Sequence, residues 1–145
     1  MPRTADNGFD AAVVDRENHT VALIEVKAHP VERWATILPR QLAKSAERVA
    51  FVLTIDPNCI QLYRTEGESL GEPIVRLDTR QVLQRYDPEF PRERVFESYL
   101  LTLVEAWLRD LAYYWKSEDP PGSDELGRAG LLEKLEGGTT QRLGA

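Results

Sequence analysis

The sequence has little cysteine or histidine: its 145 residues include one cysteine, Cys59, and two histidines. A single cysteine cannot form an internal disulfide or supply the several thiolates of a structural zinc site. Cys59 lies in the apolar run CIQLY, and we interpret it as a small apolar strand residue rather than a reactive thiol. These absences exclude a disulfide-stabilised secreted fold and indicate a reducing, intracellular environment.

Long apolar runs are also missing. No segment is long enough to span a bilayer, and the first residues lack the basic and apolar regions of a signal peptide. We therefore expect a cytoplasmic protein without a membrane partner. A glycine-rich phosphate loop and a serine nucleophile elbow are absent as well, so the common nucleotide-binding and serine-hydrolase patterns do not apply.

The chain lacks an excess of positive charge. Its formal net charge is −6, which argues against indiscriminate binding to nucleic acid. Residues 65–145 carry the whole deficit, with ten Lys and Arg against sixteen Asp and Glu, whereas residues 1–64 have eight of each. The first part is therefore neutral, and a divalent cation bound there would make it positive.

The composition is otherwise that of a globular protein, with 42% hydrophobic and 29% charged residues. The length predicts one domain, which we assign to residues 1–116. Residues 117–145 differ in character, beginning with SEDPPGSD and ending with GGTTQRLGA. We interpret them as a linker and flexible tail with at most a brief helix near Asp124–Glu136.

The first stretch with a clear pattern predicts a β-hairpin. Two apolar runs, Ala11–Val14 and Val21–Val26, are joined by a polar bend with its turn at Glu17–Asn18. The second run is apolar enough to form a central strand that is covered on both faces.

Three charged side chains lie at the open end of this hairpin. Antiparallel pairing about the turn places Asp10 directly across from Glu25. Side chains alternate between the two faces of a strand, so Lys27 lies on the same face as Glu25. A strand this apolar is a poor place for unpaired charges, because desolvating a charge is costly. We therefore expect the three side chains to converge.

Helical spacing follows His29–Pro30, with apolar residues recurring every three or four positions. Proline is tolerated at the first helical position, so we predict a short helical turn and then a main helix from Pro39 to Arg48. Three further strands are expected: Ala50–Ile55, Cys59–Arg64 and Pro73–Leu77. The first of these follows a helix and is predicted to lie parallel to the second hairpin strand.

Two more helices are predicted in the second half of the chain. A short helix capped by Asp78–Thr79 runs to about Tyr86, and a long helix runs from about Arg92 to Lys116. The apolar stripe of the long helix is mainly core, and its breadth also makes helix 92–116 the candidate contact surface of a homodimer or larger complex. Alternating strands and helices give a mixed α/β fold class.

The charged residues of the hairpin suggest a metal site. The carboxylates of Asp10 and Glu25 and the backbone carbonyl of Val26 supply hard oxygen ligands for Mg²⁺ or Mn²⁺ and leave positions for water and a phosphate oxygen. A bound metal lowers the pKa of water and neutralises charge that develops on a phosphodiester. Lys27 can orient or deprotonate the attacking water, or stabilise the added negative charge.

The segments GFDAAVVD and HTVALIEVKA, followed by a helix and then by AFVLTID and IQLYR, resemble the PD-(D/E)XK nuclease superfamily. The likeness covers roughly residues 9–64 and is strongest to the amino-terminal nuclease-like domains of type I restriction R subunits. It implies a restriction-endonuclease-like core, with a mixed central sheet flanked by helices. It also implies that Asp10 and Glu25 bind metal, that Lys27 is the catalytic lysine, and that Gln41 is a glutamine placed near the site by the following helix.

Two features depart from the family pattern. The family normally has a helix before the first strand, and residues 1–8 are too short to form it, so we expect a truncated or reduced member that lacks the usual first helix. Phe9 precedes Asp10 in place of the proline that names the motif. The long helix 92–116 would then cover the face that the missing helix leaves open.

We therefore predict a Mg²⁺-dependent endonuclease that hydrolyses phosphodiester bonds of DNA. The alternative is a catalytically inactive module of the same fold that binds nucleic acid or protein. A structural salt bridge of Lys27 with Glu25 or Asp10 would explain the same residues without chemistry.

The remaining polar candidates are weaker. Asp15 is an alternative acid, but the assumed register points it to the opposite face, so we interpret it as a turn residue. His19 and His29 are expected to be solvated loop residues, because no HxxxH or CxxC spacing accompanies them. Basic residues of the first long helical segment can contact a phosphate backbone, although such faces are usually only solvated: Arg40, Lys44 and Arg48.

Overall fold

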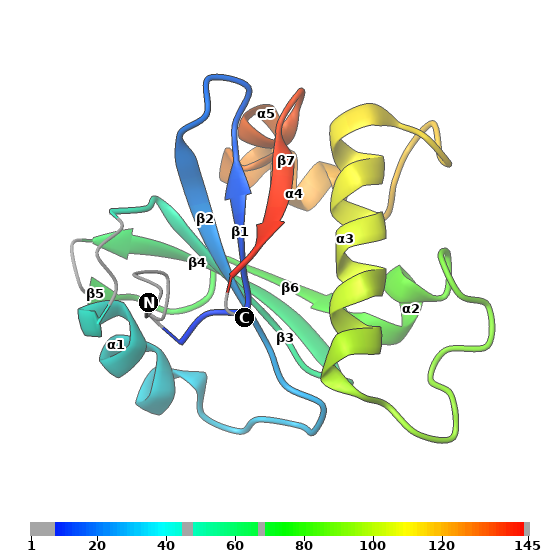
Figure 1. Cartoon of the computed structure of the whole chain (residues 1–145), viewed down its shortest axis with the longest axis horizontal. Helices are drawn as coiled ribbons and strands as arrows, with labels where there is room; N and C mark the ends of the chain where they lie inside the picture. Colours follow the sequence, from blue (N-terminus) through cyan, green and yellow to red (C-terminus); the bar gives the residue numbers. More distant parts are fainter. Residues whose placement is uncertain (1–7, 45–47, 67–68, 144–145) are drawn as a thin grey trace.

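The computed structural model describes residues 8–44, 48–66 and 69–143, which form a mixed sheet with helices on both faces (Figure 1). The sheet order is β5–β4–β3–β2–β1–β7, and β6 pairs with β4 beside β5. The strands are β1 Ala11–Val14, β2 Thr20–Val26, β3 Phe51–Ile55, β4 Cys59–Glu66, β5 Ser69–Leu70, β6 Val75–Asp78 and β7 Thr139–Arg142. The helices are α1 Trp34–Lys44, α2 Thr79–Leu83, α3 Glu97–Tyr113, α4 Ser123–Ala129 and α5 Leu132–Leu135. The predicted mixed α/β class is confirmed.

Strands β1 and β2 form the predicted antiparallel hairpin. Ala11 pairs with Ile24, and the register shifts by one residue between Val13 and Val14, next to the bend. The bend itself is closed by Asn18, whose φ of 69° lies in the left-handed region that asparagine tolerates. The ladder ends at the Ala11–Ile24 pair, so the predicted pairing of Asp10 with Glu25 lies beyond it. Asp10 is a bend residue just before β1, and its N–H donates to the Ile24 carbonyl at 2.9 Å.

The next segments form the predicted crossover. Strand β3 lies parallel to β2, with Ala22 beside Phe51 and Val26 beside Ile55, and β4 returns antiparallel to β3. From Val21 onward every residue of β2 is buried, as is every residue of β3, because helices cover both faces of the sheet at this point. Strand β6 adds an antiparallel neighbour to β4, close to the predicted edge strand.

Helix α1 differs from the prediction that Pro39 begins the main helix. The helix begins at Trp34 and continues through Pro39 to Lys44, while Arg48 lies outside it and residues 45–47 lie outside the described part of the chain. A proline within a helix costs about 3 kcal/mol. The buried side chains of Trp34, Leu38 and Leu42 offset this cost, since each contributes roughly 1.5–3 kcal/mol.

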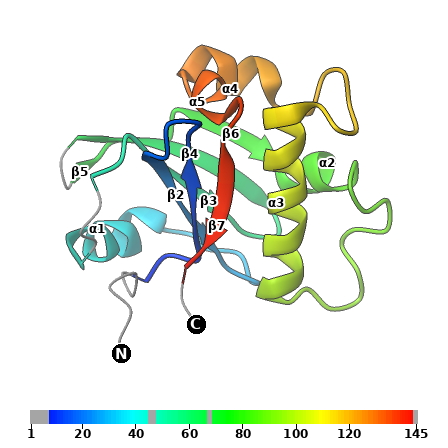
Figure 2. The same ribbon diagram turned by 45° about the horizontal axis from the view of Figure 1, so that its top comes forward.

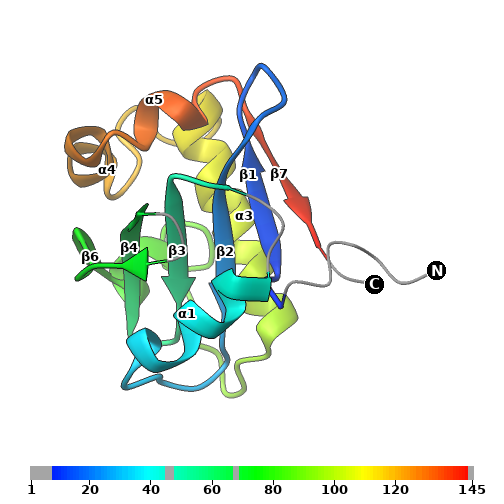
Figure 3. The ribbon, with the colours of Figure 1, turned by 90° about the vertical axis from the view of Figure 1, so that its left-hand side faces the viewer.

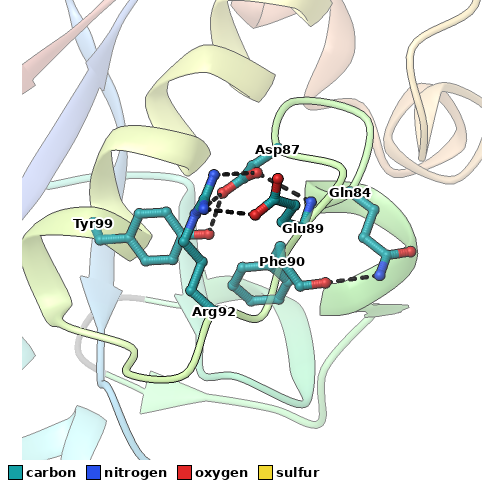
Figure 4. Close-up of polar contacts among 6 residues, drawn as sticks. All are labelled: Gln84, Asp87, Glu89, Phe90, Arg92 and Tyr99. Atoms are coloured by element: carbon teal, nitrogen blue, oxygen red, sulfur yellow. Dashed lines mark hydrogen bonds and ion pairs between the residues drawn. The ribbon is translucent and has the colours of Figure 1, made fainter.

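The bounds of α2 and α3 differ from those predicted. Helix α2 has the predicted cap, the Asp78 carboxylate accepting from the Gln81 N–H, but ends at Leu83 instead of Tyr86. Helix α3 begins at Glu97 rather than near residue 92, and Arg92 instead donates to Asp87 in the preceding loop (Figure 4). The helix ends where Tyr114 takes a left-handed conformation.

Two apolar clusters fill the two faces of the sheet. Figure 3 shows α1 in front of the sheet and α3 behind it. On the α1 face, Leu23 and Val52 pack with the apolar side of the helix. On the α3 face, Ile24 and Leu53 pack with Leu100 and Trp107. The long helix therefore packs on the face of the sheet opposite α1, and residues of α2, α4 and α5 join the same cluster.

The structure differs most from expectation after residue 122. Residues 123–142, expected to be linker and tail, contain α4, α5 and β7, and β7 pairs antiparallel with β1 (Figure 2). Leu126, Leu131 and Leu135 are each at most 2% exposed and join the core beneath α3. Burial of these three leucines holds the segment on the domain. No helix in the described part of the chain is both long and apolar enough to cross a bilayer.

Candidate functional site

The end of β2 brings Glu25 and Lys27 together. Glu25 follows Leu23 by two residues and lies on the α1 face of the sheet, where it is 1% exposed. Lys27 extends from the end of the strand, and its Nζ lies 3.1 Å from Glu25 Oε2. The lysine side chain is about one third exposed, so the pair connects the buried sheet face with solvent.

Asp10 adds a second carboxylate from the neighbouring strand end. Its Oδ2 accepts the Val26 N–H at 2.8 Å, which fixes the carboxylate beside the Glu25–Lys27 segment. The Asp10 carbonyl accepts the Leu143 N–H at 2.9 Å, so the end of β7 supports the same residue. Backbone contacts on both sides therefore hold Asp10 beside the segment that carries Glu25 and Lys27.

Burial and the Asp10 charge together raise the pKa of Glu25 from 4.5 to about 7. The ion pair with Lys27 opposes this shift but does not cancel it. For Lys27, burial lowers the pKa, and the hydrogen bond and charge of Glu25 outweigh that effect, so the pKa rises above 10.5. Lys27 is therefore a cation at neutral pH, while Glu25 exchanges its proton near neutrality.

Gln41 reaches the site from α1. Its Nε2 donates to the Gly8 carbonyl at 2.9 Å, and its amide lies close enough to Glu25 to stabilise the charged carboxylate. Gly8 has a φ of 90°, and a Cβ there would lie 3.1 Å from Gln41 Nε2. A glycine thus permits the close approach of the chain to this side chain.

Two oxygen atoms at the site have no donor. Glu25 Oε1 and Gln41 Oε1 are buried, and neither accepts a hydrogen bond within the described part of the chain. A buried acceptor without a donor is costly, and such atoms often mark the place of a missing ligand. The available groups are carboxylate and amide oxygens. Mg²⁺ and Mn²⁺ prefer oxygen ligands, so the residues present fit a hard divalent cation.

Val26, whose carbonyl is a predicted third ligand, lies between Glu25 and Lys27. Its N–H donates to the Asp10 carboxylate, and its side chain is buried in the cluster on the α3 face. The use of its carbonyl as a metal ligand stays a prediction.

One acid near the site carries no sequence signal. Glu97, the first residue of α3, lines a cavity of about 200 Å³ together with Asp10 and Arg142. Its negative charge also contributes to the raised pKa of Lys27. Glu97 is remote from the hairpin in sequence, and only the folding of α3 over the sheet brings it close.

A second acidic group lies in the β1–β2 bend. The ligand atoms of Asp15, Glu17 and His19 lie within 4.8 Å of one another, but Glu17 and His19 are exposed. The Asp15 carboxylate accepts the N–H groups of Glu17 and His19 and closes the bend. Asp15 is therefore the turn residue that the sequence predicts, and His29 is likewise exposed, as expected.

Comparison with known proteins gives no identification. No family model, no curated protein and no solved structure matches this chain.

Proposed function

We propose that the chain is a metal-dependent nuclease that hydrolyses phosphodiester bonds of DNA, built on a restriction-endonuclease-like core. One observation carries the proposal: Asp10, Glu25 and Lys27 lie together at the end of a hairpin, and the buried Glu25 Oε1 has no donor among the described residues. The salt bridge with Lys27 occupies only Glu25 Oε2, so by itself it leaves a buried acceptor unpaired, which is unfavourable.

Asp10, Glu25 and the Val26 carbonyl are the groups that would hold a Mg²⁺ or Mn²⁺ ion. When bound, such an ion lowers the pKa of water and offsets negative charge on the phosphate. Lys27 keeps its proton at neutral pH, so it acts as a cation and hydrogen-bond donor toward a phosphate oxygen or the attacking water. Gln41 holds the edge of the site through Gly8.

The order of elements supports the same proposal. A hairpin carrying the acids, a crossover helix, a parallel strand and an antiparallel return is the order that the resemblance to PD-(D/E)XK nucleases implies. In this proposal α3, which packs on the sheet from later in the chain, takes the place of the helix that the family has before its first strand.

A cleavage assay tests the proposal. Plasmid and linear DNA are incubated with the purified chain in Mg²⁺ or Mn²⁺, beside Lys27→Ala and the matched variant Lys134→Ala, whose lysine is exposed on α5. We expect cleavage by the native chain and by Lys134→Ala, and a loss of about 100-fold or more for Lys27→Ala. Equal cleavage by Lys27→Ala would remove the lysine from the mechanism.

The alternative is an inactive module of the same fold that binds a partner. Its supporting observation is the end of α3, where Tyr113, Tyr114 and Trp115 are each 45–55% exposed. Aromatic side chains are enriched in protein interfaces. Titration with Mn²⁺ separates the two proposals, because an inactive module does not require a metal site that depends on Asp10 and Glu25.

A further inference from the structure

Helix α1 has exposed charge of one sign only. Arg33, one residue before the helix, and Arg40 and Lys44 within it are all exposed, and the helix contains no acidic residue. An exposed acid, Glu32, precedes Arg33 in the chain. None of the three cations forms an ion pair or a side-chain hydrogen bond with another described residue. They are therefore available to a ligand from outside the chain.

The three cations lie on one flank of the helix. At about 100° per residue, Arg33, Arg40 and Lys44 fall within about 40° of one another. Going round the helix from the cations, Gln41 comes next and the buried side of the helix comes after it. The opposite flank carries only uncharged residues: Ala35, Thr36, Pro39 and Ala43.

This arrangement relates the cations to the candidate site. Gln41 contacts Gly8 and approaches Glu25, so the flank of α1 next to Gln41 is the flank on the side of the acids. The twelve residues from Arg33 to Lys44 extend over about 16 Å, which matches about five nucleotides of one strand. A polyanion lying along this flank would pass Gln41 and therefore run beside the carboxylates.

We propose that Arg33, Arg40 and Lys44, the cationic flank of α1, bind the phosphate backbone of the DNA strand that is cut beside Asp10 and Glu25. The inference rests on the proposed nuclease function and adds the path of the substrate. Such a surface is needed because the chain has a net charge of −6, and the site contributes further acids through Asp10 and Glu97. Charge complementarity with phosphate supplies most of the non-specific affinity for nucleic acid.

A second basic cluster provides a contrast. Arg64, Arg76 and Arg128 line a cavity between β6 and α4. Arg64 already donates to the Ala129 carbonyl at 2.6 Å and lies over the Phe51 ring, and Glu125 lines the same cavity and offsets part of the charge. Arg76 and Arg128 of this cluster serve in a control variant together with Arg109, which is exposed on α3.

Binding of DNA in the presence of EDTA tests the inference without cleavage. Fluorescence anisotropy follows a labelled single strand and a labelled duplex with the full chain over a range of salt concentrations. The test variant is Arg33→Gln/Arg40→Gln/Lys44→Gln. The control variant, Arg76→Gln/Arg109→Gln/Arg128→Gln, removes the same charge from exposed positions outside this flank.

We expect the test variant to bind at least about tenfold more weakly at 50 mM salt, and its slope of log affinity against log salt to be smaller by about 2. The control variant should bind within about twofold of the native chain. Equal losses in the two variants, unchanged binding by the test variant, or no binding by the native chain would each overturn the inference.

The outcome is separate from that of the nuclease proposal. If the chain binds DNA through the cationic flank but never cleaves it, the inference about the flank stands and the nuclease proposal fails. If cleavage depends on Lys27 but the affinity for DNA does not depend on the flank, the nuclease proposal stands and the inference about the flank fails.

Discussion

Two buried acids with basic partners can be compared in this molecule, Asp87 and Glu25. The Asp87 carboxylate accepts from Nε and Nη2 of Arg92, both at 2.9 Å, and from the Tyr99 hydroxyl at 2.5 Å (Figure 4). It also accepts the Glu89 N–H at 3.1 Å, so both oxygens are occupied. Glu25 has Lys27 on one oxygen and no donor on the other within the described residues.

The surroundings of the two acids shift their pKa values in opposite directions. The hydroxyl of Tyr99 and the guanidinium of Arg92 hold the pKa of Asp87 below its usual value. Burial and the charge of Asp10 raise the pKa of Glu25. A fully satisfied carboxylate fixes a loop, whereas an under-satisfied one beside a like charge is the arrangement that the proposed metal site requires. The comparison therefore separates a carboxylate whose two oxygens are both hydrogen-bonded from one with an oxygen left unpaired among the described residues.

The largest expected difference lies in the effect of pH on Glu25→Gln. The pKa of Glu25 is about 7 in the folded chain against an ordinary 4.5, so the folded state binds more protons between these values. The free energy of unfolding of the native chain therefore falls as pH rises from about 5 to 8, by up to about 3 kcal/mol. Glu25→Gln should lack this decline in urea titrations.

The control for this comparison is Glu133→Gln, which changes an exposed glutamate on α5. Its pH profile should follow that of the native chain. If Glu25→Gln also follows the native profile, Glu25 is not strained by its surroundings, and the contrast with Asp87 fails.

A smaller effect is expected for Asp87→Asn. The substitution removes the charge that Arg92 and Tyr99 share, so we expect the thermal midpoint to fall by about 5 °C. Binding of Mn²⁺ should be unchanged. Calorimetry beside Asp119→Asn, an exposed acid, measures both effects. A loss of metal binding in Asp87→Asn with an intact fold would mean that the two clusters are not independent.

The smallest effect is expected for Gly8→Ala. The φ of 90° disfavours alanine, and the new Cβ would press on Gln41 Nε2, so the free energy of unfolding should fall by about 1 kcal/mol. Gly71→Ala is the matched variant, because a Cβ there meets nothing within 4 Å. Equal urea midpoints for both variants would show that the contact between Gly8 and Gln41 does not stabilise the site.

The acids and the lysine of the site could be predicted from the sequence because their geometry is local. The two-residue period of a strand and a short hairpin fix the relation of Asp10, Glu25 and Lys27. The crossover to β3 follows from a helix between two apolar runs, and Gln41 then faces the site because α1 covers that side of the sheet.

The remaining features depend on contacts between distant segments. Glu97 reaches the site only because α3 packs on the sheet, and β7 pairs with β1 across most of the chain. The polar sequence TTQR of β7 gives little strand signal by itself, so its assignment depends on its partner. The predicted start of the main helix at Pro39 was wrong, because the burial of three apolar side chains outweighs the unfavourable helix propensity of a proline inside α1.

Titration with Mn²⁺ by calorimetry at pH 8, where Glu25 is largely ionised, tests the central claim most directly. The native chain is compared with Asp10→Asn/Glu25→Gln and with Asp15→Asn/Glu17→Gln, which alters the exposed acids of the bend. We predict that the native chain and the bend variant bind Mn²⁺ and that the Asp10 and Glu25 variant does not. Binding that survives in the Asp10 and Glu25 variant, or that is absent from the native chain, would contradict a metal site at the end of the hairpin.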